Sequence, residues 1–146
     1  MEKTNLIFLD IDGVLNSEHF YQITPYYTWD LFDPVCVILL NKLIKENNAF
    51  LIISSDWRKT YGISQIRDIF KQNKIKGTII DCTSIEFNKE KGINEYLKKL
   101  SKKLKVNYIV LDDEKLNINN LVQTNLKYGF SFKDYEKASK ILNNNK

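Results

Sequence analysis

The chain has 146 residues and a net charge of +4, and its hydrophobic and charged shares are 43% and 27%. These proportions are ordinary for a soluble globular protein, and the length suits one compact domain, residues 1–146, rather than two. Only five glycines and two prolines occur, which argues against long linkers and low-complexity segments.

Much of the positive charge lies in one stretch, LKKLSKKLK, at residues 97–105. As a helix, this stretch places Leu97, Leu100 and Leu104 on an inner face and its lysines outside. A solvated helical face therefore explains the charge better than a nucleic-acid footprint does. The charge permits a polyanionic partner without requiring one.

The apolar runs and the cysteines bear on where the protein resides. The first apolar run is too short for a signal peptide, and none approaches the ~20 residues that span a membrane. Cys36 and Cys82 are far apart and form no CxxC motif, which predicts neither a metal site nor a disulfide framework. We therefore expect a cytoplasmic protein without membrane contact, and the sequence does not indicate its oligomeric state.

Short apolar runs alternate with amphipathic segments along the chain. Their period and length predict, in chain order, a strand at 5–10, a helix at 33–48, a strand at 49–55, a helix at 62–73, a strand at 75–81, a helix at 91–104, a strand at 106–113, a candidate fifth strand at 120–124 and a helix at 131–143. Asp33 and Pro34 suit the start of the first helix, and Ser131 suits the cap of the last. Strands that alternate with helices form βαβ units, so we expect an α/β fold with a mostly parallel sheet covered on both faces.

Polar side chains follow three of these strands at their carboxyl ends, where parallel sheets bind ligands. They are Asp10 and Asp12 after the first strand, Ser54 and Ser55 after the second, and Asp112 and Asp113 at the end of the fourth. Two acids so close together repel each other and cost stability unless a cation or a reaction uses them. Oxygen ligands without His or Cys suit Mg²⁺ and make zinc a poor candidate. The alternative interpretation of a single Asp is turn or capping chemistry.

A phosphate site is predicted beside these acids. The Ser54 hydroxyl and the backbone N–H groups of the turn after it can cradle a phosphate, although a serine turn is the plainer interpretation. Arg58 could add positive charge. Lys89 and Lys91 lie near the start of the predicted helix at 91–104, where a lysine and the helix dipole together favour an anion.

Four motifs in this order resemble those of haloacid dehalogenase-like (HAD) phosphohydrolases, over roughly residues 5–113. FLDIDGVL (8–15) is similar to the first signature, LIISS (51–55) to the second, a lysine at the start of a helix to the third, and YIVLDD (108–113) to the acidic fourth. SSDWR, VLDDE and LVQTNLKYGFS are further similar to the HAD domain associated with Swiss Army Knife RNA repair proteins. The resemblance implies a three-layer Rossmann-like core and a phosphatase.

The resemblance also implies roles for the residues at the matching positions. Asp10 would be the nucleophile that becomes an aspartyl-phosphate, and Asp12 would protonate the leaving oxygen and then activate water. Mg²⁺ would bind Asp10, the Asp12 carbonyl and Asp112, with Asp113 assisting. Ser54, Ser55 and one lysine would hold the phosphoryl oxygens; Lys89 fits the third motif better than Lys91, but both alignments are open.

The segment at 16–32 is too short to be a cap domain and is rich in aromatic residues. We expect it to form a flap over an open site, which suits a large substrate such as a nucleic-acid end or a phosphoprotein. Bases could stack on its rings, or the rings could cover the sheet edge. Candidate substrate contacts are His19, Tyr27, Trp57 and Arg58.

The sequence thus predicts a Mg²⁺-dependent phosphomonoester hydrolase whose partner is a phosphorylated substrate, for example a 3′- or 5′-phosphate end of a nucleic acid. Two alternatives are a catalytically idle HAD-fold binding module and a phosphatase of small metabolites or phosphoproteins.

Overall fold

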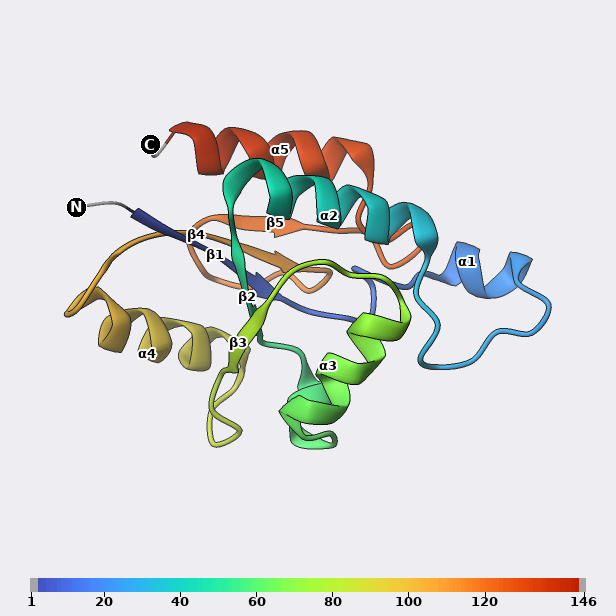
Figure 1. Cartoon of the computed structure of the whole chain (residues 1–146), viewed down its shortest axis with the longest axis horizontal. Coiled ribbons are helices and arrows are strands. Elements are labelled where there is room, and N and C mark those ends of the chain that lie inside the picture. Colours follow the sequence, from blue (N-terminus) through green and yellow to red (C-terminus); the bar gives the residue numbers. More distant parts are fainter. Residues whose placement is uncertain (1–2, 145–146) are drawn as a thin grey trace.

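The computed structural model describes residues 3–144, and its strands form one sheet in which every pair is parallel (Figure 1). The strands are β1 (Lys3–Leu9), β2 (Phe50–Ile53), β3 (Ile79–Cys82), β4 (Lys105–Asp112) and β5 (Leu121–Gln123), in the spatial order β3-β2-β1-β4-β5. The helices are α1 (Glu18–Ile23), α2 (Pro34–Asn47), α3 (Ile63–Gln72), α4 (Lys89–Ser101) and α5 (Phe132–Asn144), and a 3₁₀ turn, η1, spans Asp56–Lys59.

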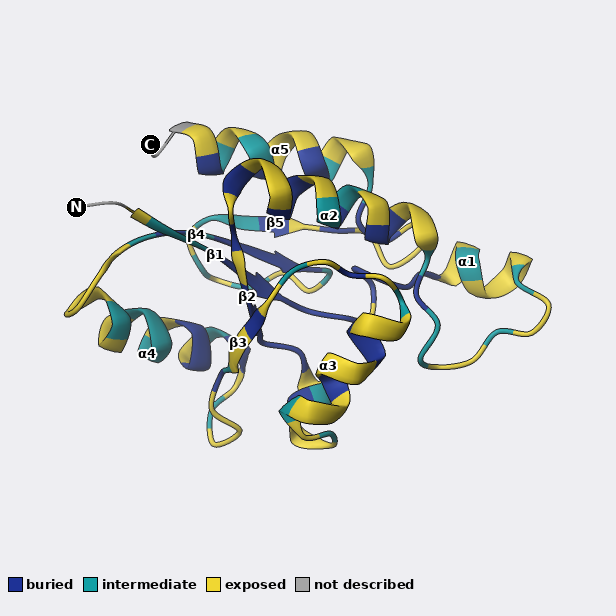
Figure 2. Ribbon diagram, in the orientation of Figure 1, coloured by how far each residue is buried: buried dark blue, intermediate teal, exposed yellow. Residues whose placement is uncertain are grey.

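Helices cover both faces of the sheet, which confirms the expected α/β/α layers. Alternate strand residues such as Leu9 and Ile53 join one core with α2, α3 and α5, whereas Phe8 joins a second core with Ile93 of α4. In Figure 1, α2 and α5 lie side by side over one face, and α4 lies against the other. Because both faces are covered, the carboxyl-terminal halves of the middle strands are buried and apolar, at residues 6–9 of β1, 51–53 of β2 and 109–111 of β4 (Figure 2).

The order of the strands determines which strand ends become neighbours. The chain passes from β1 to β2 to β3 and then returns across the sheet to β4, so β1 lies between β2 and β4. Leu9 pairs with Leu111 of β4 and with Ile53 of β2. The residues that follow β1 and β2, and the residue that ends β4, therefore meet at one edge of the sheet.

Between β1 and α2, residues 16–32 form the short helix α1 and an irregular loop that extend beyond this edge of the sheet (Figure 1). The Ser17 side chain accepts a hydrogen bond from the Phe20 N–H and caps α1, a helix that the sequence pattern did not predict. No separate cap domain occurs within residues 3–144. Within the same residues, no helix combines the length and apolar character that crossing a bilayer demands.

The largest differences from the expected boundaries occur in one helix and one strand. The helix expected at 91–104 begins at Lys89, because the Asn88 side chain accepts a hydrogen bond from the Lys91 N–H and acts as its N-cap. It ends at Ser101, so Leu104 is 42% exposed and does not belong to an inner helical face. The strand expected at 75–81 begins only at Ile79.

Two asparagines, Asn107 buried and Asn5 half-buried, join the layers at the amino end of the sheet. Asn5 of β1 and Asn107 of β4 are paired in register, and Asn107 Nδ2 donates to Asn5 Oδ1 at 3.1 Å. Asn107 Nδ2 also donates to the Leu142 carbonyl of α5 at 2.9 Å, while Asn5 Nδ2 donates to the Asn47 carbonyl at the end of α2 at 2.6 Å. These bonds fix α2 and α5 to the sheet at the end opposite the polar strand ends.

We predict that Asn107→Ala lowers the free energy of unfolding by roughly 1–3 kcal/mol, because two acceptors lose their buried donor. Urea denaturation measures the change. Asn94→Ala, at an exposed position on α4, is the matched control and should stay within about 0.5 kcal/mol of the natural chain. Equal effects of the two substitutions would contradict the structural role of Asn107.

Candidate active site

The backbone hydrogen bonds of the sheet continue one residue past the strands and hold the site together. The Asp10 N–H donates to the Leu111 carbonyl at 2.9 Å, and the Ser54 N–H donates to the Leu9 carbonyl at 3.1 Å. Asp10 and Ser54 are therefore held in the register of the sheet, as Asp112 is at the end of β4. Rigid strand ends position a side chain more accurately than a free loop does.

Three carboxylates meet at this edge. Asp10, Asp112 and Asp113 each offer an oxygen, and these atoms lie within 4.8 Å of one another. Asp10 is 4% exposed and Asp112 is fully buried. Asp112 Oδ1 accepts a hydrogen bond from the Glu114 N–H at 2.9 Å, whereas Oδ2 accepts none from the described residues. The buried acids are thus not fully compensated by the protein itself.

Burial and like charge change the proton affinity of these acids. Burial, and then the charge of Asp112, raise the pKa of Asp10 to about 9. Burial also raises the pKa of Asp112. In the absence of a further cation, ionising both acids costs free energy.

Lys89 supplies the positive charge closest to the acids. Its Nζ lies 3.5 Å from Asp10, 3.2 Å from Asp112 and 3.2 Å from Glu114. Burial lowers the pKa of this ammonium, but the two aspartates outweigh that effect and raise it above its usual value. Lys91, the other lysine that the sequence left open, places its ammonium 4.7 Å from the centre of the Phe87 ring. The structure therefore brings Lys89, and not Lys91, to the acids.

The acid cluster suits a metal ion. Its donors are carboxylate oxygens alone, the set that hard divalent cations prefer. Asp112 Oδ2 accepts no hydrogen bond from the described residues and has the Lys89 ammonium 3.2 Å away, and the pKa of Asp10 stays raised despite this charge; a site shaped for a further positive charge would show both features. Asp10, Asp112 and Asp113 can therefore hold a metal ion.

The turn after Asp10 depends on Gly13. Its φ is +82°, and a Cβ at this position would lie 2.6 Å from Asp113 Cγ. Only glycine combines this backbone conformation with so close an approach to Asp113. The Thr124 hydroxyl donates to the Gly13 carbonyl at 2.7 Å and ties the turn to the segment after β5.

Asp12 lies on this turn. Its side chain is exposed and does not belong to the cluster of three acids. Its two carboxylate oxygens accept hydrogen bonds from different donors: Oδ1 from Asn16 Nδ2 at 2.8 Å, and Oδ2 from the indole Nε1 of Trp57 at 3.0 Å. Asn16 was not recognised as a site residue from the sequence, although its place directly after the apolar pair Val14-Leu15 was an available signal. Both oxygens of Asp12 are thus held in place without a salt bridge.

The two serines after β2 have different environments. Ser54 is fully buried, and its hydroxyl has no hydrogen-bond partner among the described residues. The Ser55 hydroxyl accepts from the Trp57 N–H at 3.1 Å and caps η1. A buried unpaired hydroxyl is uncommon and calls for a ligand or water. Ser54 is therefore the better placed of the two to contact a ligand.

Arg58 has internal partners. It is 6% exposed, and its guanidinium donates to the carbonyls of Ser54, Ser55 and Phe87 at 2.9–3.0 Å. These bonds join the loop after β2 to the segment that leads into α4, and so fix Ser54 relative to Lys89. The arrangement gives Arg58 a positioning role and not an open face toward a ligand.

The remaining candidate contacts lie on or near the flap. Tyr27 is half-buried, and burial and the nearby charge of Asp12 raise the pKa of its phenol. His19 is exposed and its ring lies 5.6 Å from that of Tyr128. Among Tyr27, His19 and Trp57, it is Trp57 that donates a hydrogen bond to Asp12.

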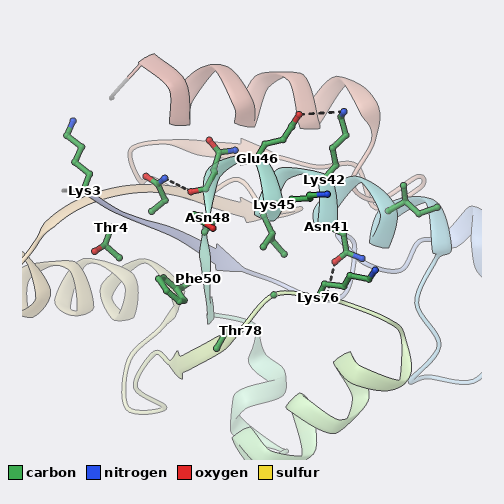
Figure 3. A pocket seen from close by; sticks show the side chains of 16 residues that line it. Lys3, Thr4, Asn41, Lys42, Lys45, Glu46, Asn48, Phe50, Lys76 and Thr78 are labelled. Atoms are coloured by element: carbon green, nitrogen blue, oxygen red, sulfur yellow. Dashed lines mark hydrogen bonds and ion pairs between the residues drawn. The ribbon is translucent and has the colours of Figure 1, made fainter.

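Two hollows in the surface differ in chemistry. One of about 280 Å³ opens beside Lys89 and is also lined by Asp56, Asn88 and Glu114. The other, about 1230 Å³, lies at the amino end of the sheet (Figure 3). There Lys42 pairs with Glu46 at 3.6 Å on an exposed surface, and the clustered acids and Lys89 lie elsewhere. The smaller hollow, and not the larger one, therefore lies beside the lysine that contacts the clustered acids.

Comparison with known families agrees with this arrangement. Residues 6–135 match the family described as the HAD domain in Swiss Army Knife RNA repair proteins. The chain belongs to this family, and the matched span includes every residue of the site. No curated protein and no solved structure matches the chain.

The site predicts an unusual effect of Asp10→Asn on stability. The folded pKa of Asp10 lies above its ordinary value of 3.8, so the metal-free protein loses stability as the pH rises from there to about 9. We expect Asp10→Asn to raise the melting temperature of the metal-free protein at about pH 8 by about 3–6 °C, or about 1–2 kcal/mol, and the gain to shrink toward about pH 4.

Thermal melts with and without Mg²⁺ measure both effects. Mg²⁺ should raise the melting temperature of the natural chain and have less effect on Asp10→Asn. Asp68→Asn, on the exposed side of α3, controls for the loss of one negative charge. A metal-free Asp10→Asn protein that melts below the natural chain at every pH would contradict this account of the acid cluster.

Proposed function

We propose that the protein is a Mg²⁺-dependent phosphomonoester hydrolase that acts on phosphorylated ends of nucleic acids. The observation that carries the proposal is the convergence of a buried carboxylate, Asp10, with an ammonium, Lys89, and an unpaired hydroxyl, Ser54, at one strand edge. A phosphoryl group needs these three partners: a nucleophile, a cation and a hydrogen-bond donor. Membership of a superfamily composed mostly of phosphohydrolases supports the same conclusion.

In the first half-reaction, an oxygen of Asp10 attacks phosphorus and the bond from phosphorus to the ester oxygen breaks. Asp12 gives its proton to that oxygen, which leaves as an alcohol, and Asp10 becomes an aspartyl-phosphate. Asn16 and Trp57 hold both oxygens of Asp12, so the proton donor has a defined direction. Lys89 and Ser54 bind the phosphoryl oxygens.

In the second half-reaction, water attacks phosphorus and the bond to Asp10 breaks. Asp12, now ionised, accepts a proton from the water, so inorganic phosphate leaves and both aspartates return to their first states. Asp10, Asp112, Asp113 and the Asp12 carbonyl would hold Mg²⁺, which offsets the negative charge between nucleophile and phosphate. Lys89 remains ionised throughout, in keeping with its raised pKa.

The substrate class is inferred from two observations. The family takes its description from Swiss Army Knife RNA repair proteins, and an RNA end is a substrate in keeping with that description. The flap leaves the site without a cap domain within residues 3–144, so the end of a long polymer can reach Asp10. A phosphatase of small metabolites would gain from enclosing its substrate instead.

Phosphate release from 3′- and 5′-phosphorylated oligonucleotides tests the proposal. We expect release that requires Mg²⁺, that EDTA abolishes, and that Asp10→Asn eliminates. Lys89→Met should lower kcat by about 10²–10³-fold, because it removes a charge that stabilises the phosphoryl oxygens. Lys91→Met is the matched control and should lie within about twofold of the natural chain, the ordinary effect of an exposed substitution.

Two results would contradict the proposal. Absence of Mg²⁺-dependent release from any phosphomonoester would indicate an idle binding module. Activity retained by Asp10→Asn would exclude the aspartyl-phosphate mechanism.

A further inference from the structure

Aromatic side chains form a compact group beside Asp12. Trp29, from the flap, and Tyr61, from the segment before α3, stack with ring centroids 5.1 Å apart and an interplanar angle of 6°. Trp57 lies 5.6 Å from Trp29 and 5.5 Å from Tyr61. We call Trp29, Trp57 and Tyr61 the aromatic wall. It joins segments that are separate in the sequence.

The wall is connected directly to the proton donor. The indole N–H of Trp57 donates to Asp12 Oδ2 at 3.0 Å, so Trp29 lies one ring beyond the residue that contacts Asp12. Trp29 is 51% exposed. Its packing against Tyr61 and Trp57 covers part of the indole, and about half of the residue is open to solvent.

The chemistry of Asp12 determines what lies next to the wall. A general acid must reach the ester oxygen that leaves, so the group attached to that oxygen lies on the side of Asp12. In a nucleotide, a ribose lies between this oxygen and the base. In the protein, the indole of Trp57 lies between Asp12 and Trp29, so a base one ribose away from the oxygen would lie near Trp29. In a phosphotyrosine the ring is bonded to the ester oxygen itself, which would place that ring nearer Asp12 than Trp29.

We propose that Trp29, supported by Tyr61, stacks on the base of the nucleotide that carries the scissile phosphate. The inference rests on the proposed phosphatase function and specifies how its substrate is held. Stacking on an indole accepts every base, because each has a π-face. The wall therefore recognises the presence of a terminal base and not its identity.

A pair of matched substrates tests the wall. One is a phosphorylated oligonucleotide, and the other is the same oligonucleotide with an abasic terminal nucleotide. We expect the natural chain to favour the first by about tenfold in kcat/KM, which is the factor that stacking of one base supplies. The ratio should fall to about one in Trp29→Ala and recover in part in Trp29→Phe.

Tyr26→Ala is the control within the same flap, since Tyr26 is 91% exposed, and it should keep the natural ratio. An equal ratio in Trp29→Ala and the natural chain would overturn the inference. So would a natural chain that hydrolyses both substrates equally well.

Tryptophan fluorescence separates this inference from the proposed reaction. The chain has two tryptophans, so Trp57→Phe leaves Trp29 as the single indole, and Asp10→Asn prevents turnover. In this double variant, the phosphorylated oligonucleotide should quench fluorescence more than its abasic partner at equal occupancy, measured by anisotropy of labelled strands. If the oligonucleotide quenches the double variant but the natural chain does not hydrolyse it, base stacking on Trp29 is supported and the proposed phosphatase activity is rejected. Binding without any difference in quenching would reject the wall.

Discussion

The mutual repulsion of buried carboxylates is the constraint on which the site depends. Asp10 and Asp112 lie together out of water, and the nearest positive charge is the single ammonium of Lys89. Burial and like charge raise the pKa of Asp10 to about 9. Ionising this acid in the folded chain therefore costs free energy, and a bound cation would lower that cost. The free energy of unfolding is lower than it would be with a neutral residue in place of Asp10, and a bound cation recovers part of that difference.

The rest of the fold keeps that cluster from relaxing. β1 is bonded on both sides, so Asp10 cannot withdraw from Asp112 without breaking the sheet. Gly13 allows Asp113 to approach where any side chain would collide, and Arg58 joins the loop of Ser54 to the segment that leads into α4. These contacts are made by backbone groups or buried side chains. The acids are therefore preorganised by the scaffold and need no large conformational change.

The parallel sheet, its two covering layers of helices and the meeting of polar strand ends at one edge could be predicted from the sequence. Continuous apolar runs that end in acids or serines allow this, because parallel strands place their carboxyl ends together. The sequence did not decide whether Lys89 or Lys91 reaches the acids. The answer depends on the residue at which the helix begins. The Asn88 cap decides this, and its bond to the Lys91 N–H is a local contact that composition does not report.

Contacts between segments that are far apart in the chain could not be predicted from the sequence. Arg58 followed a serine pair and suggested a phosphate ligand, but its partners include the Phe87 carbonyl from another loop. Tyr61 has no motif around it, and only the fold brings it onto Trp29. Most residues of the acid site could thus be named from sequence, while the aromatic wall and the role of Arg58 needed tertiary structure.

The central claim is that Asp10 is the nucleophile of a phosphoryl transfer. Borohydride reduces an acyl phosphate to an alcohol, so quenching a single turnover with borohydride and sequencing the peptides by mass spectrometry locates the covalent intermediate. We predict homoserine at position 10, formed only with substrate and Mg²⁺ present. Phosphate release with unmodified Asp10, or with the modification at another residue, would contradict it.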